Sequence, residues 1–497
     1  MAASLAVSLA FGNGSFKVTD MTAKTLCDRT LASTSAPRAQ TRPRLVLAAT
    51  ILASSLDFID GSVINVGLPA IGRSLHGDAA DLQWLVNAYL LPLSALLLLG
   101  GALGDRFGRR RLLTIGIALF AAGSAACAMA PNLASLVAAR GLQGAAAALM
   151  LPNSLAVLGG AFEGAGRNRA IGLWAASASI AGAIGPVLGG WLIDTAGWRA
   201  IFLINLPLAA AAVGIALYAI EADPKPQGEA RLDLTGAVMV TAALTGLTWA
   251  LTEGAGPQGW TAPAVLALIT GVILAVGFGW TEARLGDRAM TPLALFGSRN
   301  LVALNLLTLL LYGVLAGFML LLPYLLITNL GYSATAAGAA LLPFPIIMAL
   351  ASPLMGDLAG RIGPRRPLIA GAGLVAAGCA LALLAPKGAG YWTGVLPGII
   401  AVALGMAAAA APLTAAVLGA VDSRHTGAAS GLNSAVAQLG GVIVIALIGQ
   451  VLATHDGAFV HAFDGAAVVG AMVAIAAGVT IALLFRAPQR GSSASSP

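Results

Sequence analysis

The sequence predicts an all-α membrane protein with fourteen transmembrane helices. Hydrophobic residues make up 58% of its 497 residues and charged residues only 9%, whereas a soluble domain carries roughly 25% charged residues. The apolar residues form continuous runs of about 20, the length at which a helix crosses the hydrocarbon core. Barrel strands would instead alternate over runs of about ten. These observations exclude a soluble or disordered chain.

Short loops join the fourteen runs. In chain order, the predicted helices are 46–70, 82–103, 112–130, 133–158, 169–193, 199–219, 233–253, 262–283, 300–328, 335–356, 367–386, 392–418, 427–452 and 465–485. Residues 1–44 and 486–497 flank them as tails. The first tail is expected to be a disordered cytosolic segment, and the start of translation is left open between Met1 and Met21.

The basic residues predict the orientation, because Lys and Arg collect in cytoplasmic loops. If the N-terminus is placed in the cytosol, 23 of the 27 basic residues fall on the cytoplasmic side. Three fall outside, at Arg73, Arg199 and Lys387, and Arg140 falls inside a helix. The net charge of +7 therefore indicates orientation, with both termini cytoplasmic in the inner (plasma) membrane, and not a nucleic-acid surface.

An internal repeat divides the chain into two parallel halves. The loop 101–111, after the second helix, aligns with the loop 356–366, after the tenth, at an offset of 255 residues. Eight helices separate the copies, where two plain six-helix bundles would leave six. We therefore predict a bundle at 45–219, an inserted helix pair at 233–283 and a second bundle at 300–485. A site between the bundles is expected near the middle of the membrane.

The first copy of the loop carries Gly101, Asp105, Arg106, Gly108 and Arg109 in the pattern G-x-L-x-D-R-x-G-R. This pattern resembles the signature of the major facilitator superfamily, and the fourteen helices resemble its drug:proton antiporter branch. The resemblance covers nearly the whole chain and implies two six-helix bundles of major facilitator type. It also implies that Asp105 and Arg106 form a latch that opens as the bundles rock. The second copy lacks the Asp, and plain membrane anchoring is the alternative role for the arginines.

Two carboxylates lie deep inside the first predicted helix. Of the 20 acidic residues, only Asp57 and Asp60 lie well inside a predicted span, where a charge costs roughly 2.5–3.5 kcal/mol even on insertion scales. Their i,i+3 spacing puts them on one helix face, where repulsion and burial favour binding of a shared proton. The segment from Asp60 to Pro69 resembles the first-helix motif of the antiporter branch, which implies proton coupling or substrate recognition. A structural hydrogen bond is the alternative.

Arg140 is the only cation inside a predicted span. Its segment resembles the helix-4 motif L-x-x-x-R-x-x-Q-G of the family, which implies a partner in proton transfer. A buried guanidinium stabilises a neighbouring carboxylate that has lost its proton. The alternative is a structural arginine capped by backbone carbonyls.

A glycine- and proline-rich motif occupies the fifth predicted helix, at Gly182, Gly185, Pro186, Gly189 and Gly190. It resembles the G-x-x-G-P-x-x-G-G signature that marks antiporters within the superfamily. Pro removes a backbone hydrogen bond, and Gly permits close helix contact. We therefore expect a pliable seam that seals one side of the protein and opens on the other.

The substrate-facing residues are less sharply defined. A pocket for bulky organic compounds is mostly apolar, with a few polar groups. The candidates are polar or aromatic residues within spans, namely Asn65, Asn87, Tyr89, Gln143, Trp174 and Asn305. Interhelical hydrogen bonding or anchoring at the membrane interface is the alternative for most of them.

The sequence lacks the motifs of several common kinds of catalytic and binding site. No Lys follows a Gly, no Ser stands between glycines at −2 and +2, and His and Cys form no cluster, so an ATP loop, a nucleophile elbow and a metal site are not predicted. We expect no enzyme activity and no cofactor. The resemblance implies a proton-driven exporter of drugs or toxic organic compounds, with lipid, protons and small organic substrates as partners. A periplasmic adaptor protein is left open.

Two rival functions remain at this point. One is a transporter of the same fold for a specific metabolite, such as a sugar or an amino acid, against which the fifth-helix signature argues. The other is a receptor or scaffold with a transporter fold. The charged residues inside the membrane argue against the scaffold, because it has no need to carry their cost.

Overall fold

The structure, a computed structural model, describes residues 42–162, 164–221, 234–254, 259–286, 297–385, 390–421, 426–453 and 456–485. Within these ranges the chain forms helices and turns and no strand, which confirms the all-α prediction for them. The two predicted tails lie outside these ranges, apart from residues 42–44, where the first helix begins.

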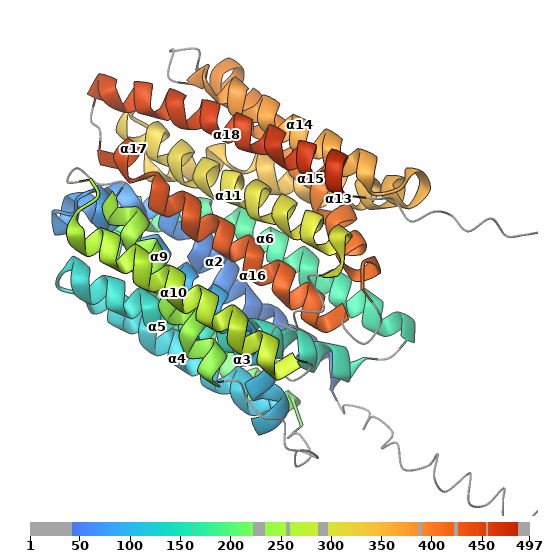
Figure 1. The fold of residues 1–497 in the computed structure, drawn as a ribbon. Coiled ribbons are helices and arrows are strands. Elements are labelled where there is room, and N and C mark those ends of the chain that lie inside the picture. The colour runs from blue at the N-terminus through green and yellow to red at the C-terminus, as the bar shows by residue number, and fades with distance from the viewer. Residues whose placement is uncertain are drawn as a thin grey trace, which may run out of the picture. The chain divides into compact units, whose positions relative to one another are not determined.

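Three groups of helices follow one another along the chain (Figure 1). The N-terminal half contains α2 (Pro43–Leu75), α3 (Ala79–Phe107), α4 (Arg109–Met129), α5 (Leu133–Ala161), α6 (Gly164–Ala196), α7 (Ala200–Leu203) and α8 (Asn205–Ala219). The inserted pair contains α9 (Leu234–Gly254) and α10 (Ala262–Leu285). The C-terminal half contains α11 (Arg299–Thr328), α12 (Ala334–Ala340), α13 (Pro343–Ile362), α14 (Arg365–Ala382), the π-helix η4 (Tyr391–Val395), α15 (Leu396–Gly419), α16 (Thr426–Leu447), α17 (Gly449–Ala453) and α18 (Asp456–Leu484).

Every predicted span coincides with one of these helices or with consecutive ones. Among the described residues, ten helices are long and apolar enough to cross a membrane. Shorter apolar helices occur at Ile180–Ala196 and Gly431–Leu447. The helical membrane fold is therefore confirmed.

Three predicted spans are interrupted, namely 199–219 at Ile204, 427–452 at Ile448 and 335–356. The span 335–356 forms α12 and α13, with an interruption at Leu341 and Leu342. Pro343 follows the interruption as the first residue of α13. Leu342 keeps helical backbone angles, but a proline has no N–H to donate to the carbonyl four residues before it, and this missing hydrogen bond explains the break.

The last helix begins earlier than predicted, at Asp456 rather than at residue 465. The added stretch buries Phe459 and Phe463 in the core, and this burial explains the extension. Asp464 consequently lies inside α18. The expectation that only two acidic residues lie well inside spans is therefore wrong.

The repeated loop makes the same turn in both halves. Gly108, between α3 and α4, has a φ of 98°, and Gly363, between α13 and α14, has a φ of 84°. Glycine adopts such values without the steric cost that a side chain brings. This requirement explains why both copies of the loop carry a glycine at this aligned position.

The halves meet differently at the two ends of the bundle. We call the end with Asp194 and the start of α3 the Asp194 end, and the end with Arg106 and the start of α4 the Arg106 end. At the Asp194 end, one apolar cluster contains residues of both halves, such as Leu68 of α2 and Leu325 of α11. At the Arg106 end, each half has a separate cluster. Among the described residues, the apolar core that the halves share therefore lies at the Asp194 end.

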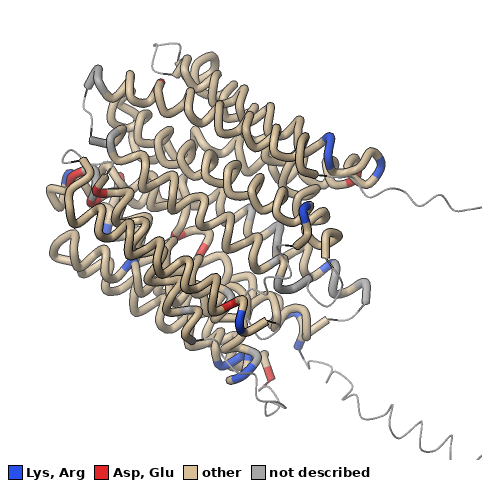
Figure 2. The backbone as a smooth tube through the Cα atoms, in the orientation of Figure 1, with Lys and Arg blue, Asp and Glu red and all other residues tan. Residues whose placement is uncertain are grey.

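Basic and acidic residues differ in their position along the helices. In Figure 2, most basic segments lie toward the ends of the helices, whereas some acidic segments lie midway along them. The acidic segments midway along the helices mark the region in which a functional site is expected, because charge inside a membrane is costly.

The inserted pair packs as a unit. The helices α9 and α10 lie side by side (Figure 1), and α9 also contacts α3 and α16, one helix from each half. Apolar side chains of α10, including Leu266, Ile273 and Val276, are exposed. In a bilayer, this surface contacts lipid.

Candidate functional site

A buried ion pair joins the two predicted coupling helices. Asp60 of α2 and Arg140 of α5 are buried and form an ion pair. The side-chain amides of Gln143 and Asn205 also donate hydrogen bonds to Asp60, at 3.2 and 3.0 Å. Arg140 further donates to the carbonyl oxygen of Leu85 at 3.1 Å. Several donors therefore compensate one buried carboxylate, as a stable buried ion pair requires.

The spacing along α5 explains how Arg140 and Gln143 act together. They stand at i and i+3 and therefore share a helix face, and Arg140 Nη1 donates to Gln143 Oε1 at 3.0 Å. Gln143 also donates to the Ser124 hydroxyl of α4 at 2.8 Å. The sequence suggested Gln143 as a substrate contact, and the structure places it beside the ion pair.

The second carboxylate of α2 has a different partner. Asp57 is buried and accepts a hydrogen bond from the hydroxyl of Tyr89 on α3. The guanidinium carbon of Arg140 lies 4.3 Å from the centre of the Tyr89 ring, within the range of a cation–π contact. Asp57, Asp60, Tyr89 and Arg140, with the amides of Gln143 and Asn205, thus form one buried group, which we call the carboxylate cluster.

A cavity of about 490 Å³ lies between the two halves. Its lining consists of Phe58, Ser62, Asn65, Ala178, Gly182, Ala183, Pro186, Tyr312, Leu315, Met319, Leu341, Phe344, Pro345 and Met348. The three lining residues of α2 stand at i, i+4 and i+7 and so define one helix face. The two carboxylates of α2 lie on a different face. One helix therefore carries the carboxylate cluster and part of the cavity wall.

The glycine- and proline-rich motif of α6 packs against α2. Gly182 and Pro186 line the cavity. A Cβ added at Gly185 would stand 3.3 Å from the carbonyl oxygen of Ile59, and one added at Gly189 would stand 2.6 Å from a methyl group of Val63. These glycines therefore permit a close contact of the kind that small residues allow between membrane helices.

Gly190, the last residue of that motif, faces α12 across the boundary between the halves. An added Cβ would stand 2.6 Å from the backbone nitrogen of Thr335. Gly338 of α12 faces α6 in the same way, 2.9 Å from the backbone nitrogen of Val187. The backbones of α6 and α12 are thus close enough to exclude side chains, and they close the Asp194 end.

A hydrogen-bonded clasp reinforces this contact. Asp194, which follows the predicted span 169–193, accepts hydrogen bonds from the backbone N–H and the hydroxyl of Thr335, at 2.9 and 2.6 Å. It also accepts one from the backbone N–H of Ala334 at 3.3 Å. Partial burial acts to raise the pKa of Asp194, but these hydrogen bonds hold it below its usual value. The clasp therefore binds the two halves through an ionised carboxylate.

The predicted latch residues lie at the Arg106 end. Arg109 donates to the carbonyl oxygen of Ala156 on α5 at 3.5 Å. Arg106 is exposed, with its guanidinium carbon 5.4 Å from the Phe107 ring. The side chain of Asp105 lies outside the described part of the chain, and the latch stays a prediction. Gly101 stands close to α5, because an added Cβ would be 3.5 Å from Pro152.

The other substrate candidates lie in separate places. Asn65 lines the cavity between the halves. Trp174 donates to the Ser54 hydroxyl at 2.9 Å, and Asn305 donates to a carbonyl of its own helix at 3.1 Å. Asn87 is buried and has no hydrogen-bond partner among the described residues. These last three residues do not line the cavity.

Sequence reasoning overlooked Asn205, a member of the carboxylate cluster. Asn205 donates to Asp60 and, at 3.2 Å, to the Ser124 hydroxyl. Asn205 is the only side-chain amide in the predicted helix 199–219. Its isolation in an apolar run was the available signal, because a buried amide needs a partner.

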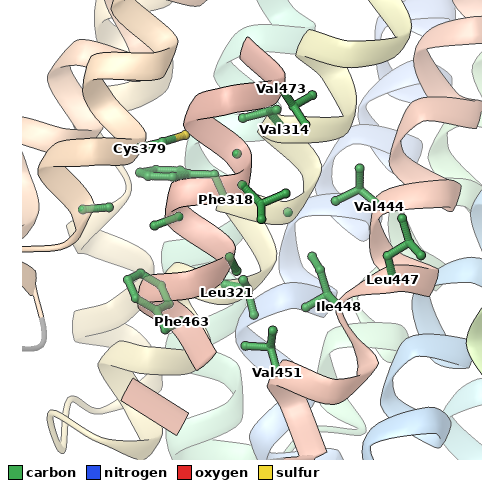
Figure 3. Close-up of a pocket in the computed structure, with 16 residues that line it drawn as sticks. Val314, Phe318, Leu321, Cys379, Val444, Leu447, Ile448, Val451, Phe463 and Val473 are labelled. Carbon is green, nitrogen blue, oxygen red and sulfur yellow. The ribbon is translucent and has the colours of Figure 1, made fainter. Parts of the chain in front are cut away.

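A second cavity, of about 340 Å³, lies within the C-terminal half. Figure 3 shows side chains from α11, α16 and α18 around it, with Phe318 and Phe463 among them. The labelled side chains are apolar apart from the thiol of Cys379. Such a lining cannot orient polar groups, whereas the cavity between the halves offers Ser62 and Asn65. The cavity between the halves is therefore the candidate substrate site.

Two repeated helical halves, a cavity between them and a buried carboxylate cluster are typical of a membrane transport protein. The model of the Major Facilitator Superfamily matches residues 50–304 and 304–497. The chain belongs to this family.

The described residues contain no group of three or more His, Cys, Asp or Glu placed to hold a metal ion.

Several relatives have names that state a function. The Multidrug resistance protein Stp of Mycobacterium tuberculosis is 37% identical over 82% of this chain and 76% of its own length. The Tetracenomycin C resistance and export protein of Streptomyces glaucescens is 32% identical over 86% and 79%. The Cephamycin export protein CmcT of Amycolatopsis lactamdurans is 34% identical over 89% and 93%.

Solved structures share the fold. A POT family transporter in complex with a thioalcohol conjugated peptide has a TM-score of 0.65 and 13% identity, over 88% of this chain and 95% of that chain. The peptide transporter POT in complex with sulfate has a TM-score of 0.62 and 17% identity, over 88% and 94%. At this level of identity, the likeness concerns the fold alone.

Proposed function

We propose that the protein is a proton-coupled antiporter that exports drugs or other toxic organic compounds across the plasma membrane by alternating access. The observation that carries the proposal is the carboxylate cluster. Two buried carboxylates beside one guanidinium are costly in a membrane, and charged residues at such positions usually have a function. The relatives named for multidrug resistance and for antibiotic export support the substrate class. The proton gradient supplies the energy, without ATP or a bound cofactor.

The helix α2 provides the link between proton and substrate. Its carboxylates lie in the cluster with α3, α5 and α8, while Phe58, Ser62 and Asn65 line the cavity. Gain or loss of a proton changes the charge on one face of this helix. The resulting change in the position of α2 alters the cavity wall on its other face, and this coupling is reciprocal.

The basic loops favour an orientation with the Arg106 end in the cytoplasm. The Asp194 end, where the halves share a core and a clasp, then faces outward. In this state the exporter is closed to the outside, and compounds reach the cavity from the cytosol or the inner leaflet. Opening of the Asp194 end releases the compound, and a proton from outside then resets the carrier.

A resistance assay tests the proposed function. The protein and its Asp60→Asn variant are expressed in a host that lacks its own exporters, and growth is measured against a panel of toxic compounds. The protein should confer resistance and lower the accumulation of the compound, and the variant should lose both at an equal level in the membrane. A matched control is Gly172→Ala, where an added Cβ has no heavy atom within 4 Å.

Two results would contradict the proposal. One is resistance no greater than with an empty vector for every compound in the panel. The other is strict transport of a single sugar or amino acid in a parallel uptake assay, which would favour the specific metabolite transporter instead.

A further inference from the structure

The two carboxylates of α2 have unequal surroundings. Asp60 accepts hydrogen bonds from Arg140, Gln143 and Asn205. Asp57, one helical turn earlier, accepts one from the described residues, from the hydroxyl of Tyr89. Both side chains are buried, so the difference lies in the donors and not in access to water.

The carboxylate cluster has a net charge of −1 when both carboxylates are ionised and Arg140 is protonated, so one added proton makes it neutral. The charged or titratable groups that act on Asp57 from the described residues are Asp60 of its own helix, Tyr89 of α3 and Arg140 of α5. One guanidinium balances one carboxylate. An uncompensated charge is costly in a buried site, and binding of a single proton removes it.

The partners decide which carboxylate holds this proton. Protonation of Asp60 would leave Arg140 buried without its counter-ion, and the Nη2 atom of Arg140 already has no hydrogen-bond partner among the described residues. Protonation of Asp57 leaves the ion pair intact. It also keeps the Tyr89 contact, because a protonated carboxyl still accepts hydrogen bonds.

We propose that Asp60 stays ionised in its pair with Arg140, and that Asp57 is the carboxyl that takes up and releases the transported proton. Tyr89 is its positioning residue. In each cycle a hydronium ion gives its proton to a carboxylate oxygen of Asp57, where an O–H bond forms and a water molecule remains. The same O–H bond later breaks as the proton passes to water on the other side. This inference rests on the proposed function.

Tyr89 connects the proton site to the fixed ion pair. Its hydroxyl donates to Asp57, and its ring lies under the guanidinium of Arg140, with 4.3 Å between the guanidinium carbon and the ring centre. The negative charge of Asp57 is therefore held near Arg140 without direct pairing. Loss of this charge on protonation changes the field at Arg140, and this change transmits the proton-binding state to α5.

Infrared spectroscopy of the full chain in lipid nanodiscs tests the proposal, because the carbonyl band of a protonated carboxylic acid is distinct from that of a carboxylate. At neutral pH the protein should show such a band. The band should be absent in Asp57→Asn, retained in Asp60→Asn, and shifted in frequency in Tyr89→Phe, which keeps the ring but removes the hydroxyl. Asp194→Asn is the matched control and should leave the band unchanged, because this carboxylate is ionised.

Three results would overturn the proposal. They are a band that survives in Asp57→Asn, a band that disappears in Asp60→Asn while that variant is folded, and no band in the parent protein at neutral pH. If Asp60→Asn does not fold, the loss of the band in Asp57→Asn and its shift in frequency in Tyr89→Phe still show whether Asp57 holds the proton. A band assigned to Asp57 in a protein that moves no protons would overturn the proposed function alone. Proton-coupled export with the band assigned to Asp60 would overturn this inference alone.

Discussion

Addition of one methyl group at Gly190 should open the Asp194 end. The Cβ of Gly190→Ala would stand 2.6 Å from the backbone nitrogen of Thr335, whereas ordinary contact begins at 3.4 Å. The helices α6 and α12 must therefore separate by about 1 Å, and overpacking of this kind costs about 1–3 kcal/mol. Because the cost falls on the closed state, it should shift the equilibrium toward the open state by about 5–150-fold.

Pulsed EPR distances measure this shift. Spin labels are attached at Thr195→Cys on α6 and Ala336→Cys on α12, two exposed positions on either side of the clasp. In Gly190→Ala, the population with a long distance should grow at the expense of the short one. The matched control, Gly172→Ala on the same helix, has open space around the added Cβ and should keep the original distribution. An unchanged distribution in Gly190→Ala, or an equal shift in both variants, would refute the reasoning.

Three further predictions concern the ion pair, the cavity and the clasp. Arg140→Ala should lower stability by about 3–5 kcal/mol because it leaves a buried carboxylate without its counter-ion, and thermal unfolding of the purified protein measures this loss. Ala183→Trp should fill the cavity between the halves and abolish resistance to bulky compounds, whereas Ala466→Trp, in the apolar cavity of the C-terminal half, should leave resistance near the parent level. The hydrogen bonds of Thr335 hold the pKa of Asp194 below its usual value, so their stabilisation is present above about pH 3.9 and is lost as the pH falls through the folded value. The difference in melting temperature between the parent protein and Asp194→Asn should therefore vanish in acid, and a difference that persists there would contradict this account.

The positions of the helices could be predicted from the sequence, because a helix that spans a lipid bilayer needs a long apolar run. The sequence could also locate Asp57, Asp60 and Arg140, because an ionised group inside such a run stands out. The break before Pro343 and the early start of α18 were harder to predict. They depend on backbone chemistry at one residue and on the burial of two phenylalanines in an apolar cluster.

The partners within the site could not be predicted from the sequence. Tyr89 and Gln143 were candidates for substrate contact, but they meet the carboxylates because α3 and α5 cross α2 at one level. The same is true of Asn205, which lies 145 residues from Asp60 along the chain. Such contacts follow from the packing of four helices, and no local pattern along one helix specifies them.

The most direct test of the central claim is proton movement by the purified protein in liposomes that contain a pH-sensitive dye. The compound is one to which the protein confers resistance, and it is supplied on one side of the membrane without a pH gradient. The account predicts that movement of the compound drives protons in the opposite direction, and that Asp57→Asn abolishes this proton signal. Movement of the compound without a proton signal in the parent protein would contradict it.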